Sequence, residues 1–267
     1  MKKFYVLVLA IILLSQVSAQ IQGVSNNKLV VVGPETIGLR TFEFEPGFGY
    51  IWSKKSFDNS GNLVPLDPIK DSILVLQALV FRFTYGFASS FEIGAIVTSN
   101  LDAFSLGFKY NFYNSPKFLA AAFLGSNLSN ESDIAFRNTG IYGKTMAVVG
   151  GFAFMNRFGE SERLSLDYDI QYQNTFDTEK SYADDIFASI ELGLMFKNAV
   201  QLISGFNYRY NHYKTDRPDS WVTTWNIGMT TKPGKMFVII LNVPIDIAGR
   251  NTQRFAGFQL VLTIGLD

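Results

Sequence analysis

Cysteine is missing from this 267-residue chain, and histidine occurs once. The absence of cysteine excludes disulfides, thiolate metal ligands, thiol nucleophiles and the lipidated cysteine of a bacterial lipoprotein. The one histidine, His212, stands between Asn211 and Tyr213, where we expect an exposed loop position rather than a general base. Ser204 and Asp216 are close in sequence, but no pattern makes them converge on His212. We therefore predict no catalytic residue and no enzyme.

Charge imbalance and cofactor motifs are missing as well. The chain has 23 basic and 23 acidic residues, so its net charge does not attract nucleic acid, and we predict no nucleic-acid partner. There is no glycine-rich phosphate loop, no EF-hand run and no histidine-based zinc spacing, so the sequence predicts no cofactor and no metal site. The pair Asp184-Asp185 is interpreted as a solvated loop rather than a calcium site.

Long apolar runs are also missing after residue 20. A helix that crosses a bilayer needs ~20 apolar residues, so a membrane role would depend on strands. The shorter run from Phe4 to Leu14 follows Lys2 and Lys3 and precedes Val17-Ser18-Ala19, which is the order of a signal peptide and its cleavage site. We expect residues 1–19 to be a signal peptide and the mature chain to begin at Gln20.

What the sequence does contain is an alternation of period two, in a composition that is 15% aromatic. From Thr41 to Trp52 the even positions carry aromatic side chains and one proline, while the odd positions are mostly polar or small. The same pattern recurs from Leu164 to Gln173 and from Val200 to Asn211. Successive side chains of a strand point to opposite faces, whereas a helix would scatter them. The chain is therefore predicted to be all-β.

The alternation divides the chain into about twelve predicted strands. Most are long enough to cross a bilayer, because ~9–11 residues suffice for a tilted strand. The predicted strands cover residues 39–53, 72–87, 90–98, 102–113, 117–126, 141–157, 162–175, 185–197, 199–211, 221–231, 235–246 and 253–266.

The predicted connections alternate in length, with exceptions near Asn100 and Gly249. Short turns at residues 88–89, 114–116, 159–161, 197–198 and 232–234 alternate with longer links at 54–71, 127–140, 176–184 and 212–220. Outer-membrane barrels have short periplasmic turns and longer outer loops. An even number of strands then places the N- and C-termini on the periplasmic side.

A soluble β-sandwich is the alternative fold, since its strands alternate too, but it hides its apolar face and exposes a charged one. A lipid-facing barrel instead places apolar residues outside, with aromatics near the interfaces. The long strands and the many aromatics favour a transmembrane up-and-down antiparallel barrel over residues 39–267. Residues 20–38 are predicted to be a periplasmic segment, with a plug inside the barrel as the other open reading.

Charged residues within the strands provide a check on this assignment, because Lys or Arg facing mid-membrane lipid costs about 2–4 kcal/mol. Lys144 and Arg254 fall on the aromatic face, but near strand ends, where long side chains reach the interface. Most of the other charges fall on the polar face, and these are our candidate lumen-facing, pore-lining residues: Glu43, Glu45, Arg82, Glu92, Lys109, Arg163, Asp167, Asp169, Glu191, Arg209 and Asp246.

Two more detailed expectations follow from the assignment. The aromatic residues should point outward, with Trp52 and Trp221 marking the outer rim: Phe44, Phe48, Tyr50, Trp52, Phe83, Tyr85, Phe108, Tyr110, Tyr168, Tyr208, Trp221, Trp225 and Phe258. On the inner face, Glu45, Arg82, Glu92 and Lys109 should form a belt of ion pairs across the first four strands, with Arg82 beside both Glu45 and Glu92.

A family resemblance adds to these inferences. The run Arg40 to Tyr50, with Arg82 to Phe87, Phe91 to Ala95 and Leu106 to Tyr110, resembles the outer-membrane transporter family named for the phenol meta-degradation pathway. The resemblance covers the first third of the chain and implies a barrel that takes up or exports small, often apolar compounds. The C-terminus departs from many such barrels, because it ends in Asp267 rather than in the aromatic residue that serves as an assembly signal.

The polar interior and the resemblance together predict a bacterial outer-membrane channel or transporter for small solutes, and the resemblance implies that these are often apolar. The expected partners are outer-membrane lipid, a small-molecule solute and the outer-membrane assembly machinery. Twelve strands fall between small filled barrels and wide porins, so the interior could be open or plugged. The alternative function is a non-transport anchor that binds a partner through its long outer loops, and an outer-membrane enzyme comes third.

Overall fold

The structure is a computed structural model and describes residues 24–25, 28–66, 73–99, 101, 103–129, 145–159, 163–177, 183–196, 200–213, 218–233 and 236–266. The expected signal peptide, Lys144, Asp216 and Asp267 lie outside these residues. In the described part of the chain no helix is long and apolar enough to cross a membrane.

The described residues form thirteen β-strands, and all of their pairings are antiparallel. The strands are β1 (Phe42–Phe57), β2 (Leu63–Pro65), β3 (Leu74–Ala88), β4 (Phe91–Thr98), β5 (Ala103–Asn114), β6 (Phe118–Ser129), β7 (Thr145–Phe158), β8 (Leu164–Asp177), β9 (Ala183–Phe196), β10 (Val200–Tyr213), β11 (Ser220–Thr231), β12 (Phe237–Arg250) and β13 (Thr252–Leu266).

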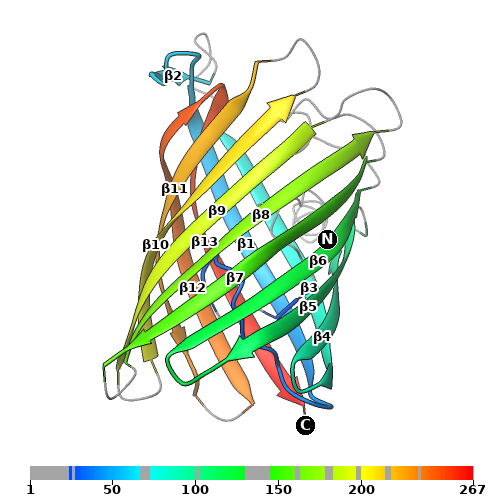
Figure 1. Ribbon diagram of the computed structural model, residues 1–267. Helices are drawn as coiled ribbons and strands as arrows, with labels where there is room; N and C mark the ends of the chain where they lie inside the picture. Colours follow the sequence, from blue (N-terminus) through cyan, green and yellow to red (C-terminus); the bar gives the residue numbers. More distant parts are fainter. Residues whose placement is uncertain are drawn as a thin grey trace, which may run out of the picture.

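The sheet closes on itself, because β1 pairs with β3 along one edge and with β13 along the other. Every later strand pairs with its neighbours in sequence, so the wall is an up-and-down barrel of twelve strands, as predicted (Figure 1). The remaining strand, β2, is not part of the twelve-stranded wall. It lies in the predicted 54–71 loop and pairs with Lys55–Phe57 at one end of β1. Closure satisfies the backbone groups that an open edge would leave unpaired.

The side chains alternate between the two faces of the wall as the period of two predicts. On β3 and β5, Phe83, Tyr85, Phe108 and Tyr110 are exposed, whereas Arg82, Thr84 and Lys109 between them are buried. The other rings named above lie on the same outward face, and several form cross-strand pairs, such as Phe44 with Phe83 and Tyr208 with Trp221. The in-and-out register assigned from the sequence is therefore confirmed.

The two ends of the barrel differ as expected. Residues 89–90 join β3 to β4 and residues 115–117 join β5 to β6, while longer links such as the one from Ser129 to Thr145 leave the opposite end. In Figure 1 the C-terminal end of β13 lies at the lower end, with the short turns, and β2 lies at the upper end. The β12–β13 turn at Asn251 is a short connection at the upper end, which was one of the expected exceptions.

The described residues before β1 lie inside the barrel (Figure 1). We call residues 24–25 and 28–38 the N-terminal segment. Val31 is completely buried. One apolar cluster joins the segment to β6 and β7, and it consists of Val24, Val32, Phe123, Val149 and Ala153. A second cluster joins the segment to β10 and β12, and it consists of Leu29, Val30, Ile203 and Ile240. The segment therefore contacts opposite sides of the wall.

A glycine pair allows the segment to approach the wall closely. The amide of Arg40 donates to the carbonyl of Gly86 on β3 at 2.6 Å, and a Cβ added at Gly86 would lie 1.7 Å from the carbonyl oxygen of Gly38. Gly38 itself has a φ of +96°, which a side chain disfavours. Glycine at both positions lets the chain turn from the interior into β1.

Candidate functional site in the barrel interior

The interior side chains that the sequence singled out fall into two groups. Eight are buried in the barrel, namely Glu45, Arg82, Glu92, Lys109, Asp167, Asp169, Glu191 and Asp246, and Glu43 and Arg209 are partly buried. Arg163 stands one residue before β8, is exposed, and lies apart from this set.

We call the interior face of β1, β3, β4 and β5 the paired wall, because its charges neutralise one another. Glu45 and Arg82 are direct cross-strand partners and form an ion pair, and Thr263 donates to the same carboxylate at 2.6 Å. Glu92 and Lys109 are likewise direct partners, with 3.0 Å between Lys109 Nζ and Glu92 Oε1, and both are fully buried. These two ion pairs were predicted from register.

The predicted link between the two pairs is wrong. Arg82 lies opposite Ile96 on β4, while Glu92 lies opposite Gly86 on β3. The turn at residues 89–90 and a register shift between Gly86 and Ala88 displace β4 along β3 relative to the simple fold-back about Phe87. The belt is therefore two separate ion pairs.

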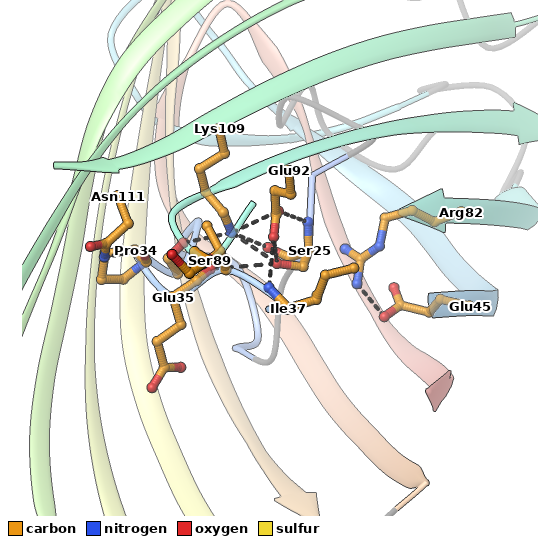
Figure 2. Close-up of polar contacts among 12 residues, drawn as sticks. Ser25, Pro34, Glu35, Ile37, Glu45, Arg82, Ser89, Glu92, Lys109 and Asn111 are labelled. Atoms are coloured by element: carbon orange, nitrogen blue, oxygen red, sulfur yellow. Dashed lines mark hydrogen bonds and ion pairs between the residues drawn. The ribbon is translucent and has the colours of Figure 1, made fainter. Parts of the chain in front are cut away.

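The Glu92–Lys109 pair also holds the N-terminal segment (Figure 2). Glu92 accepts hydrogen bonds from the amide of Ser25 at 2.6 Å, from the Ser25 hydroxyl at 2.8 Å and from the amide of Ile37 at 3.0 Å. Lys109 Nζ donates to the carbonyls of Ser25 at 2.9 Å and Gly33 at 3.0 Å. One buried ion pair thus forms hydrogen bonds with residues near both ends of the segment.

We call Asp167 and Asp169 of β8 and Glu191 of β9 the acidic wall. Asp167 lies directly opposite Glu191. Asp167 Oδ2 is 3.0 Å from the ammonium of Lys28, a residue of the N-terminal segment. Glu191 accepts hydrogen bonds from the amides of residues 29, 30 and 31 at 3.2, 2.5 and 3.2 Å, and Asp169 accepts one from the amide of Val32 at 2.6 Å.

A third interior region, on β10 to β13, carries mainly neutral polar groups. A chain of amides crosses four strands, with Asn226 donating to Asn207 at 2.7 Å and Asn242 donating to Asn226 at 3.1 Å and to Gln259 at 3.0 Å. Asp246 accepts hydrogen bonds from the Thr224 hydroxyl and the Phe255 amide.

Asp185 lies in the interior too, where it accepts hydrogen bonds from Gln173 at 3.1 Å and Arg209 at 3.4 Å. The interpretation of Asp184-Asp185 as a solvated loop is wrong, because both residues lie in β9 and Asp185 is buried. Asp184 is half-buried and accepts a hydrogen bond from the Tyr172 hydroxyl at 3.0 Å.

At the end of the barrel opposite the short turns, His212 is an exposed residue near the end of β10. Its Nδ1 lies 3.0 Å from Asp219 Oδ1, and Asp219 also accepts a hydrogen bond from the Tyr210 hydroxyl at 2.5 Å. That hydroxyl lowers the pKa of Asp219, with help from the amide of Tyr213. Ser204 is exposed on the outward face, where the Trp225 indole donates to it at 3.0 Å. The structure does not bring Ser204 to His212.

Within the described ranges, no group of three or more His, Asp or Glu side chains is arranged to hold a metal ion.

Comparison with solved structures identifies the architecture. An outer-membrane channel from Pseudomonas putida F1 superposes with a TM-score of 0.68 at 11% identity, over 90% of this chain and 100% of that one. The chain has the fold of an outer-membrane β-barrel. The KdgM porin in complex with oligogalacturonate (TM-score 0.51, 9% identity, 85% and 99% coverage) and the β-domain of the Bordetella autotransporter BrkA (0.52, 9%, 85% and 100%) have barrels of similar fold. No protein-family profile and no curated protein matches the sequence.

Several residues of this outer-membrane barrel escaped the sequence reasoning. Ser25 and Lys28 of the N-terminal segment were not singled out, because they precede the first strand and carry no periodic signal. The amide chain was missed because neutral side chains were not counted when interior charges were collected. A signal was available, since Asn226, Asn242 and Gln259 all occupy inward positions of their strands.

Proposed function

We propose that this chain is an outer-membrane channel for small solutes and that its N-terminal segment plugs the barrel. The observation that carries the proposal is the placement of that segment across a charged interior, where side chains from β4, β5, β8 and β9 hold it by polar contacts. These contacts are made by side chains and one stretch of backbone, so the segment can leave without breaking a strand pairing. Exchange of such a segment with a solute would open the barrel.

The resemblance of residues 39–112 to the phenol meta-degradation transporter family, and the match in fold to a solved channel, support this assignment. We infer from the resemblance that the solutes are small and partly apolar. The short turns share the end of the barrel where β13 finishes, which supports periplasmic termini. Outer-membrane lipid and the assembly machinery are the partners that such a barrel requires.

Reconstitution tests the proposal. Full-length protein and a variant lacking residues 20–38 would be inserted into planar bilayers and into liposomes for solute-swelling assays. We expect small, transient conductance from the full chain and larger, steadier conductance from the deletion variant. A barrel that is folded in both forms and passes no solute in either form would contradict channel function.

A surface-binding anchor is the second candidate, and contacts at the outer rim favour it. The side chain of Asn59, in the link after β1, accepts hydrogen bonds from Arg250 at 2.7 Å, and Asn251 donates to the carbonyl of Asp219 at 2.9 Å. Three outer connections are therefore joined into one surface. Shortening the 54–71 link separates the two functions, because it should abolish partner binding by an anchor and leave the conductance of a channel intact.

A further inference from the structure

The acidic wall has an electrostatic arrangement that the rest of the barrel does not explain. Asp167 and Glu191 are direct cross-strand partners, and like charges in that position repel. Lys28 is within ion-pair distance of Asp167 and also acts electrostatically on Glu191, and it belongs to the N-terminal segment rather than to the strands of the wall. The strands of the wall thus leave these carboxylates to be neutralised by something that enters the barrel.

The wall supplies part of the hydrogen bonding, since the Ser165 hydroxyl donates to Asp167 Oδ2 at 2.9 Å and Gln171 Nε2 donates to Asp169 Oδ2 at 3.2 Å. The other contacts are N–H donors of the N-terminal segment. Lys28 supplies an ammonium group, and the amides of residues 29–32 supply four further hydrogens to Glu191 and Asp169. An ammonium or guanidinium solute offers the same combination of positive charge and several N–H donors. The N-terminal segment therefore has the chemistry of an intramolecular ligand for this site.

Two buried acceptors show that the segment does not use all of the site. Asp167 Oδ1 and Gln171 Oε1 have no hydrogen-bond partner within the described residues, and each of these two side chains is 1% exposed. A buried acceptor without a hydrogen-bond partner is unfavourable, so a ligand with additional donors would gain hydrogen bonds to these two oxygens. Both oxygens belong to inward positions of β8, on the same row as Asp169.

The surface beside the acidic wall is apolar. Strand β7, which pairs with β8, contributes Val149 and Ala153, and these pack with Phe123 against Val24 and Val32 of the segment. Departure of the segment would uncover that cluster next to the carboxylates. A ligand that fits both surfaces carries a cationic head and a small apolar body.

We propose that the acidic wall is a binding site for a small organic cation, an alkyl- or arylammonium or guanidinium compound, which competes with Lys28 and the amides of the N-terminal segment. This rests on the proposed channel function, in which the segment leaves the barrel. Because a solute and the segment use the same carboxylates, binding of the cation shifts the barrel towards the state with the segment released.

Release of the segment can be measured at an introduced thiol, since the chain has no cysteine of its own. Val31→Cys places the thiol at a fully buried position of the segment, and its modification rate is followed in the folded full-length protein in lipid vesicles. The probes are n-butylammonium, the neutral isostere n-butanol and the anion butyrate. We expect butylammonium to accelerate modification by about tenfold and the other two to have no comparable effect.

Two variants separate a ligand site from a structural role. Lys28→Gln removes the internal competitor, so half-maximal acceleration should need about tenfold less butylammonium. Asp167→Asn removes the site, so the basal rate rises but butylammonium no longer changes it. Asp246→Asn, at a buried carboxylate bonded to Thr224 and Phe255, is the matched control and should respond as the parent does.

The outcomes distinguish this inference from the proposed function. Equal acceleration by butanol and butylammonium, or identical responses of the Lys28→Gln and Asp167→Asn variants, would overturn the cation site even if the barrel conducts. Ammonium-dependent release in a barrel that passes no solute would support the site and count against the channel.

Discussion

The paired wall and the acidic wall bury carboxylates in the same interior but neutralise them differently. Glu45 and Glu92 each have a basic partner on the neighbouring strand, fixed by the register of the sheet. Asp167 and Glu191 face each other and depend on the N-terminal segment. The first arrangement lies within the sheet, whereas the second requires the N-terminal segment. If the segment leaves as proposed, the acidic wall is the part of the interior that would change.

The largest loss of unfolding free energy is expected for a substitution in the paired wall. Lys109→Met leaves Glu92 buried without its cation, and removing one partner of a buried ion pair costs about 3–5 kcal/mol. Urea unfolding in lipid vesicles, followed by tryptophan fluorescence, measures this cost. The double variant Glu92→Gln with Lys109→Met should recover part of the loss, and a single variant as stable as the parent would remove the basis of the comparison.

Removal of the cation that pairs with the acidic wall should lower the unfolding free energy by less. Lys28→Met removes the cation from Asp167, but the segment can withdraw and let water reach the carboxylates, so we expect about 1 kcal/mol in the same unfolding assay. The difference between the Lys109→Met and Lys28→Met variants is the sharpest measure of the contrast. Equal losses would mean that the segment is as fixed as a strand.

The crossing at Gly86 provides an independent perturbation of the segment. Gly86→Ala places a methyl group 1.7 Å from the carbonyl of Gly38, and such overpacking costs about 1–3 kcal/mol or expels the segment at this point. Faster modification of the Val31→Cys thiol would report expulsion. Gly150→Ala is the control, because its new Cβ would meet its nearest atom at 3.4 Å, and it should behave as the parent does.

The smallest effect is expected for an ion pair near the strand ends. Arg157 and Glu35 are 2.6 Å apart but their side chains are 28% and 37% exposed, so Arg157→Gln should change stability by about 1 kcal/mol or less. The effect should shrink at high salt, because exposed charges are screened. A loss as large as that of Lys109→Met, or one that salt does not alter, would show that this pair belongs with the buried ones.

The barrel was predictable from sequence because its information is local. The alternation from Thr41 to Trp52 fixes which face each side chain takes, and a register that is wrong by one residue would have reversed every assignment. The pairs Glu45–Arg82 and Glu92–Lys109 followed from the same rule once turns were placed. The Arg82–Glu92 contact failed because a bulge changes register without leaving a clear mark in the sequence.

The interior site was less predictable, because half of it comes from a segment without periodicity. The backbone amides of residues 29–32 bind Glu191 and Asp169, and any residue except proline provides such an amide. Lys28 could have been paired with an acid only after β8 and β9 were placed around it. Contacts of this kind depend on three-dimensional closure rather than on local pattern.

The N-terminal segment also constrains how the molecule assembles. Its residues are the first of the described chain to be synthesised, yet Glu191, which binds three of its amides, comes about 160 positions later. Contacts between such distant positions form slowly, because a long loop must close first. The wall itself is sealed by β1 and β13, the first and last strands. The seam between them forms next to the point where the segment turns inward, so threading of the segment and closure of the seam are expected to be one coupled, late step of folding.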